Sequence, residues 1–99
     1  MVQHIVSWNY ADGFSDDENK ANAQRVKCEL EALKDMIEGI VELTVHTDIL
    51  PSGNKDIVLY SLFENVDYLN DYQIHPEHQR VSAYVGTVVK NRVCVDYVV

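Results

Sequence analysis

The chain has 99 residues, and its 16 acidic residues outnumber its 8 Lys and Arg residues, which gives a formal net charge of -8. A chain of this length has room for one domain, spanning residues 1–99, and its acidity disfavours nucleic acids and anionic membranes as partners. No apolar run approaches the roughly 20 residues of a membrane-spanning helix, and no charged-then-apolar leader opens the chain. We therefore expect a cytoplasmic protein.

The first predicted elements are a strand and a long helix. Apolar and polar residues alternate from Val2 to Tyr10, which predicts a strand. The residues that share one face of this strand are Val2, His4, Val6 and Trp8. Ser15 and Glu18 have the spacing of a capping box, and Gly39 suits a helix C-terminus. Between them, apolar residues recur every three or four positions, at Ala23, Val26, Leu30, Leu33 and Ile37. This period predicts a helix that packs against a sheet.

The middle of the chain predicts two strands joined by a loop. Residues 41–49 alternate between apolar and polar types, and the residues from Pro51 to Asn54 form a turn cluster. The nearly continuous apolar run Ile57–Phe63 is typical of an inner strand that is covered on both faces.

The last third predicts two helices and a closing strand. Asn65 can cap a short helix that contains Tyr72, and Pro76 suits the first turn of a second helix. The valine-rich residues 92–99 predict a final strand. The order β-α-β-β-α-β is that of a ferredoxin-like α+β fold, a four-stranded antiparallel sheet with helices on one face.

The predicted strands carry apolar residues on both faces, although helices cover only one. These residues include Val6, Trp8, Tyr60, Leu62 and Val98. An apolar patch of this size is usually buried by a partner. We therefore expect a homodimer in which two sheets pack face to face and enclose a cavity between them. His4, Val6 and Trp8 share a strand face and would line that cavity.

The densest chemical signal is the segment from Tyr72 to His78, which also contains His75. A neighbouring Tyr and His can act as acid and base for proton removal beside a carbonyl. His78 would lie in the first turn of a helix, where the helix dipole favours a neutral ring, and His4 is a third candidate. The alternative is that His75 caps the helix, His78 bonds a backbone carbonyl and Tyr72 packs in the core.

Metal binding is a weaker hypothesis. His46, Glu42 and Asp48 share one strand face, but the two histidines at positions 75 and 78 lack the HExxH spacing of a zinc site. We expect neither a metal nor another cofactor. The two cysteines, Cys28 and Cys94, form no CxxC motif, and we expect both to be buried or half-buried free thiols.

Four segments together resemble the stress-responsive α/β-barrel (Dabb) domain family. They are Val-Gln-His-Ile-Val around His4, Leu-Lys-Asp-Met-Ile-Glu-Gly-Ile, Asp-Tyr-Gln-Ile-His-Pro-Glu-His from Asp71, and the closing Val-Cys-Val-Asp-Tyr. The resemblance covers nearly the whole chain, and the Tyr-x-x-His-Pro-x-His run is its most specific part. It implies a dimeric α/β barrel.

The resemblance implies less about activity, because the family includes plant stress proteins without an assigned reaction and a plant polyketide cyclase. By similarity to that cyclase, Tyr72 and His78 would be the acid-base pair and His4 a supporting residue. Val6, Trp8 and His75 would then contact a small hydrophobic or polyketide-like ligand. We expect a small-molecule-binding protein with cyclase-like or isomerase-like chemistry; the alternative is a non-catalytic stress or structural protein.

Overall fold

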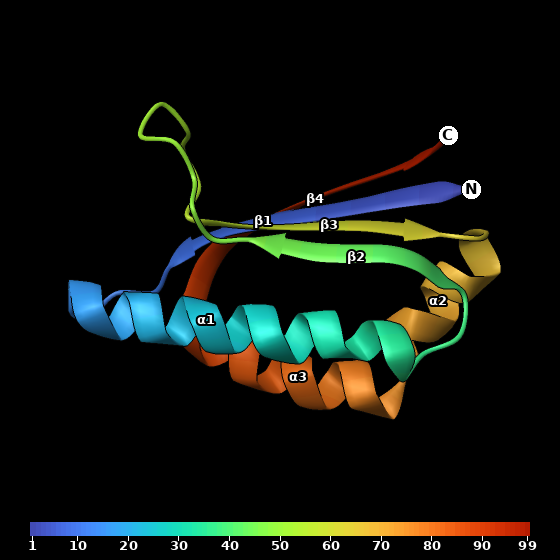
Figure 1. The fold of residues 1–99 in the computed structure, drawn as a ribbon, viewed down its shortest axis with the longest axis horizontal. Helices are drawn as coiled ribbons and strands as arrows, with labels where there is room; N and C mark the ends of the chain where they lie inside the picture. The colour runs from blue at the N-terminus through green and yellow to red at the C-terminus, as the bar shows by residue number, and fades with distance from the viewer.

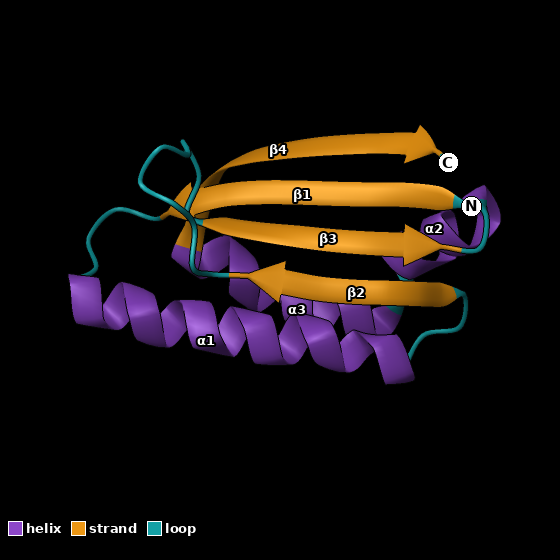
Figure 2. Ribbon diagram, turned by 45° about the horizontal axis from the view of Figure 1, so that its top comes forward, coloured by secondary structure: helices purple, strands orange, loops and turns teal.

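The computed structural model describes residues 1–99, which form one antiparallel sheet with helices on one of its faces (Figures 1 and 2). The elements in chain order are β1 (Val2–Tyr10), α1 (Asp16–Ala32), the 3₁₀ turn η1 (Leu33–Asp35), β2 (Ile40–His46), β3 (Ile57–Phe63), α2 (Val66–Ile74), α3 (Pro76–Val88) and β4 (Val89–Val98). The strands lie side by side in the order β2-β3-β1-β4. The predicted ferredoxin-like α+β fold is confirmed.

The N-terminus of α1 is closed by the predicted capping box. The Ser15 hydroxyl accepts a hydrogen bond from the Glu18 amide at 3.2 Å, and the Glu18 carboxylate accepts one from the Ser15 amide at 3.0 Å. The α-helix ends at Ala32, earlier than predicted, because the chain tightens into η1 before Gly39. Gly39 has a φ of +90°, the left-handed conformation for which glycine is suited.

We predict that Ser15→Ala destabilises the protein by about 1 kcal/mol, the usual effect of losing a side-chain cap. The amide of Glu18 would lose its acceptor, while the rest of the helix would be unchanged. Urea unfolding at one fixed protein concentration measures the change. Ser52→Ala in the exposed loop before β3 is the matched control. Equal stability of the two variants would contradict a stabilising role for the cap.

The core lies between the sheet and the helices. Side chains from both layers are fully buried there, among them Val26, Leu33, Val45, Phe63 and Val81. The β1 face formed by Val2, His4, Val6 and Trp8 is also buried. The assignment of Val6 and Trp8 to the uncovered face of the sheet was therefore wrong. Alternation separates the two faces of a strand, but it does not say which one the helices cover.

Two strand boundaries differ from the sequence prediction. β2 ends at His46 rather than Ile49, and β4 begins at Val89, three residues before the predicted start at Arg92. Pairing decides the second boundary, because Val89 and Lys90 lie opposite Tyr10 and Asn9 in the β1-β4 ladder.

The prediction for Cys28 was wrong, since its side chain is exposed on α1, whereas Cys94 is half-buried as expected. None of the helices combines the length and apolar character needed to cross a membrane.

The face of the sheet away from the helices is largely apolar and open to solvent. Tyr60, Ile5 and Val95 lie in one row across β3, β1 and β4. The next row contains Gln3, whose side-chain amide donates a hydrogen bond to Tyr60 and accepts one from Tyr97. We call this surface the outer sheet face. No helix of the chain covers it (Figure 1).

Candidate functional site

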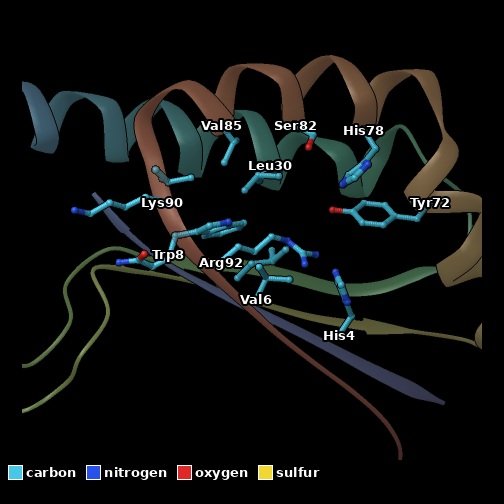
Figure 3. Close-up of a pocket in the computed structure, with 14 residues that line it drawn as sticks. His4, Val6, Trp8, Leu30, Tyr72, His78, Ser82, Val85, Lys90 and Arg92 are labelled. Carbon is cyan, nitrogen blue, oxygen red and sulfur yellow. The ribbon is translucent and has the colours of Figure 1, made fainter. Parts of the chain in front are cut away.

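A cavity of about 240 Å³ lies between the sheet and the helices of one chain. Its walls are β1, β3 and the start of β4 on one side and α1, α2 and α3 on the other. The polar side chains that line it include His4, Tyr72, His78, Ser82, Lys90 and Arg92. The apolar side chains that line it include Val6, Trp8, Leu30, Leu59, Val85 and Val89. Figure 3 shows Tyr72, His78 and His4 gathered at one end and Trp8 at the other.

The position of this cavity corrects the sequence prediction. We expected a cavity enclosed by two sheets of a dimer, but the pocket lies on the opposite face of the sheet, within one chain. His4, Val6 and Trp8 line this pocket because their strand face points toward the helices. His4, Tyr72 and His78 line one pocket, as the sequence led us to expect, but this pocket lies on the helix-covered face of the sheet and not on the outer one.

Tyr72 lies in the last turns of α2, and its side chain is fully buried. Its ring centroid is 5.0 Å from that of Phe63 and 4.3 Å from that of His78. The hydroxyl points toward the pocket in Figure 3 and has no hydrogen-bond partner in the protein. Burial raises the pKa of Tyr72 above its usual value, so the group is a neutral phenol throughout the physiological range. A buried donor without an acceptor is uncommon in folded proteins.

His78 lies in the first turn of α3 and is half-buried. Burial lowers the pKa of His78, and the nearby His4 and Arg92 act in the same direction. The prediction of a neutral ring agrees with this shift, but its main cause is burial rather than the helix dipole. The Nδ1 atom faces the carbonyl oxygen of Gln73 at 3.3 Å. Because a carbonyl only accepts, we assign the proton to Nδ1, which leaves Nε2 as an acceptor.

His4 is held by Asp96, which lies directly opposite it in the β1-β4 ladder. The His4 Nδ1 atom and the Asp96 carboxylate are 2.5 Å apart, and the imidazole is almost fully buried. An ionised carboxylate only accepts, so His4 also carries its proton on Nδ1 and has a free Nε2. The His4 and Tyr72 rings are 6.2 Å apart at their centroids. The pocket thus holds two histidines with the same tautomer beside one phenol.

His75 has a different role from the two pocket histidines. It links α2 to α3, and its Nδ1 atom accepts a hydrogen bond from the Glu77 amide at 3.1 Å. His75 therefore caps α3, which is the alternative role that the sequence also allowed. His75 is not among the residues that line the pocket, so the structure does not bring it together with the other predicted substrate-binding residues, Val6 and Trp8.

The chain was compared with protein families and with solved structures. The model of the Dabb family, described as the stress responsive A/B barrel domain, matches residues 2–99. This chain belongs to the Dabb family. The predicted resemblance is therefore confirmed over nearly the full sequence. A comparison with functionally curated proteins found no significant match.

Several solved structures share the fold of this Dabb domain. A dimeric protein of unknown function from Bacteroides fragilis is 32% identical, with 97% of this chain and 93% of that chain covered and a TM-score of 0.89. A Dabb family protein from Mesorhizobium loti is 18% identical, with 98% and 94% covered and a TM-score of 0.76. A hydroxynitrile lyase from Passiflora edulis is 16% identical, with 99% and 92% covered and a TM-score of 0.81. The last two likenesses show a shared fold.

One group in this Dabb domain has the residue types and proximity of a metal site. The ligand atoms of His4, Cys94 and Asp96 lie within 4.8 Å of one another. Burial raises the pKa of the Cys94 thiol, with Asp96 adding to the shift, which opposes the thiolate that a metal would bind. The weaker sequence hypothesis, His46 with Glu42 and Asp48, does not form such a group.

Sequence reasoning missed Asp96 and Arg92 of this site. Both lie on β4, on the strand face that points toward the helices. Their alternation with Cys94 was visible in the sequence, but their neighbours on β1 were not. The β4 pattern itself gave no signal, because both side chains are exposed on an edge strand, where charged residues are common.

Proposed function

We propose that this Dabb domain binds a small carbonyl compound in the pocket and moves a proton on it. The observation that carries the proposal is the buried Tyr72 hydroxyl, which has no partner in the protein and points toward the pocket (Figure 3). A ligand oxygen would supply the missing acceptor. The free energy of leaving a buried donor unpaired is about 1 to 3 kcal/mol, and a bound carbonyl would recover it.

The neighbouring histidines give this proposal its chemistry. Tyr72 would donate a hydrogen bond to the carbonyl oxygen and so stabilise the negative charge that forms when an adjacent C–H proton leaves. Nε2 of His78 or of His4 would accept that proton. His78 is the first choice because its lowered pKa keeps it neutral near pH 7, while Asp96 fixes the tautomer of His4. The histidine would then return the proton to the ligand. Protonation at a different atom would complete an isomerisation, whereas protonation after the ligand has formed a new carbon–carbon bond would complete a ring closure.

Access to the Tyr72 hydroxyl requires one side chain to move. The hydroxyl is shielded from solvent, and the His78 ring lies against the Tyr72 ring. His78 is only half-buried and belongs to a different helix, so we propose that its ring turns when a ligand enters. This movement would place the phenol and the imidazole on the same ligand.

We also propose that the chain forms a homodimer through the outer sheet face. The supporting observations are its exposed Val93, Val95 and Tyr97 side chains and the description of the Bacteroides fragilis relative as dimeric. Contact between two outer sheet faces would bury these side chains. The pocket would lie on the far side of each sheet, so each copy would keep a complete site.

The alternative function is that of a non-catalytic stress or structural protein. It is favoured by two contacts, because His75 caps α3 and His78 faces a carbonyl of α2. On this hypothesis the histidines serve the junction of α2 and α3, and the pocket binds nothing. Thermal melts of His78→Ala separate the two functions: a loss of several degrees without any ligand favours the structural role.

The test of binding is a screen of small carbonyl compounds against the wild type and His78→Ala. Trp8 lines the pocket and is the only tryptophan, so its fluorescence reports ligand entry. We expect that some compounds bind to the wild type and change the Trp8 emission. In His78→Ala, we expect these compounds to be turned over no longer, or to lose the exchange of hydrogen between solvent and the ligand carbon. Glu77→Ala, in the same helical turn, is the control. Identical behaviour of wild type and His78→Ala toward every hit would contradict the proton-transfer role.

The lowered pKa of His78 predicts a pH-dependent stability. The unfolded chain, with an ordinary histidine pKa near 6.5, binds a proton before the folded protein does. The free energy of unfolding should therefore fall as the pH falls from about 7.5 toward 5.5. His78→Asn should lessen this fall in urea unfolding at fixed protein concentration. His46→Gln, on the exposed end of β2, should keep the wild-type slope; an unchanged slope in His78→Asn would refute the assignment.

A further inference from the structure

The charged side chains that line the pocket are opposite in sign to the net charge of the chain. Acidic residues outnumber basic ones by 16 to 8 overall, yet the pocket is lined by Lys90 and Arg92 and by no Asp or Glu. A concave site lined by one sign of charge attracts the opposite sign. An acidic surface keeps the protein soluble, but solubility does not require the pocket wall to lack carboxylates. We therefore relate the positive lining to the charge of the ligand.

Arg92 is the lining cation whose charge is not compensated. Lys90 forms an ion pair with Asp12, with 2.6 Å between nitrogen and oxygen. Arg92 takes part in none of the ion pairs of the protein. Figure 3 shows its side chain running into the pocket, with the guanidinium directed toward the Tyr72 end. The neutral state of His78 leaves Arg92 as the principal positive group there.

We infer that the ligand of this pocket is a small organic carboxylate with an apolar body, and that Arg92 binds its carboxylate. The inference rests on the proposed binding function and specifies the class of its ligand. A guanidinium matches a carboxylate with two parallel hydrogen bonds. The apolar body would lie against Trp8, Val6 and Leu59, and a carbonyl on it would face Tyr72. The 240 Å³ volume is below the usual range for drug-sized ligands, about 300 to 1,000 Å³.

The test uses matched pairs of ligands that differ only in charge. A panel of small keto acids, such as 4-oxo-4-phenylbutanoate, is titrated against the protein at pH 7.5 beside the corresponding keto amides, with Trp8 fluorescence as the readout. The wild type should bind the acids about tenfold or more tightly than the amides. Arg92→Gln should weaken the acids about 10-fold to 100-fold, the usual effect of losing a charge-assisted pair, and leave the amides unchanged.

Two further variants exclude general effects of charge and folding. Arg92→Lys keeps the positive charge without the planar group, so it should retain part of the preference for acids. Arg80→Gln removes an arginine that pairs with Glu77 on the surface of α3 and lies outside the pocket lining, so it should bind both ligand types as the wild type does. Circular dichroism confirms that each variant is folded before titration.

The possible results separate this inference from the proposed function. Equal or tighter binding of the amides by the wild type would overturn the carboxylate class and leave the pocket as a binding site. An unchanged preference in Arg92→Gln would overturn the role of Arg92. The inference would also be overturned if no acid bound to the protein while neutral carbonyl compounds of the wider screen did bind. Failure of all compounds, neutral and charged, would overturn the proposed function itself.

Discussion

Replacing Tyr72 with phenylalanine is expected to stabilise the protein and to weaken ligand binding in the same variant. The Tyr72 hydroxyl is buried and has no acceptor, and removing such a group relieves a desolvation cost of about 1 to 3 kcal/mol. The ring itself would keep its contacts with Phe63 and His78. Urea unfolding at fixed protein concentration should show a gain within that range.

The same substitution should lower the affinity for a carbonyl ligand about tenfold or more, because the ligand oxygen would lose its hydrogen-bond donor. Trp8 fluorescence measures this loss. Tyr84→Phe is the matched control, since Tyr84 lies on α3, against Arg25 and outside the pocket lining, and it should change neither quantity. A Tyr72→Phe protein that is less stable than wild type and binds every ligand equally well would support the structural hypothesis.

Val95→Lys is expected to convert the proposed homodimer into monomers. Val95 is 52% exposed in the chain and lies in the middle of β4 on the outer sheet face, beside Ile5. Contact between two such faces would bury two lysines without partners. An unpaired buried charge costs about 3 to 5 kcal/mol, which corresponds to a dissociation constant raised roughly 100-fold or more.

Sedimentation velocity over a range of protein concentrations measures the association. Val66→Lys is the control, because Val66 is 50% exposed but lies on α2, away from the outer sheet face. It should sediment as the wild type does. A wild-type protein that is monomeric at micromolar concentration would contradict the proposed dimer. Equal dissociation of the two variants would show that the outer sheet face is not the contact surface.

The sequence predicted the local features of the fold because these depend on nearby residues. The capping box of Ser15 and Glu18 forms as predicted, and so does the helix start at Pro76. The alternation in β1 separated the residues of its two faces, although it did not show which face the helices cover. The end of α1 and the start of β4 were less predictable. The first depends on the turn into η1, and the second on pairing between Val89 and Tyr10.

Three of the predicted site residues, Tyr72, His78 and His4, line one pocket, but the sequence did not indicate the residues around them. The likeness to the Dabb family and the spacing of Tyr72 and His78 were visible in the sequence. His4 could be added because it shares a strand face with Val6 and Trp8. The proximity of Asp96 to His4 depends on the register between β1 and β4, and residues 92 positions apart in sequence carry no local signal of that register.

The element order, the buried face of the first helix and the chemical types available for a site were readable from the sequence alone, because periodicity, caps and motifs are local properties. The face of the sheet that the helices cover depends on the tertiary structure, and so does the position of the pocket within one chain. It also distinguished the histidines: His75 accepts a hydrogen bond from a backbone amide, whereas His4 and His78 line the pocket. The physical reason is that burial, tautomer and unpaired charge depend on contacts between distant segments.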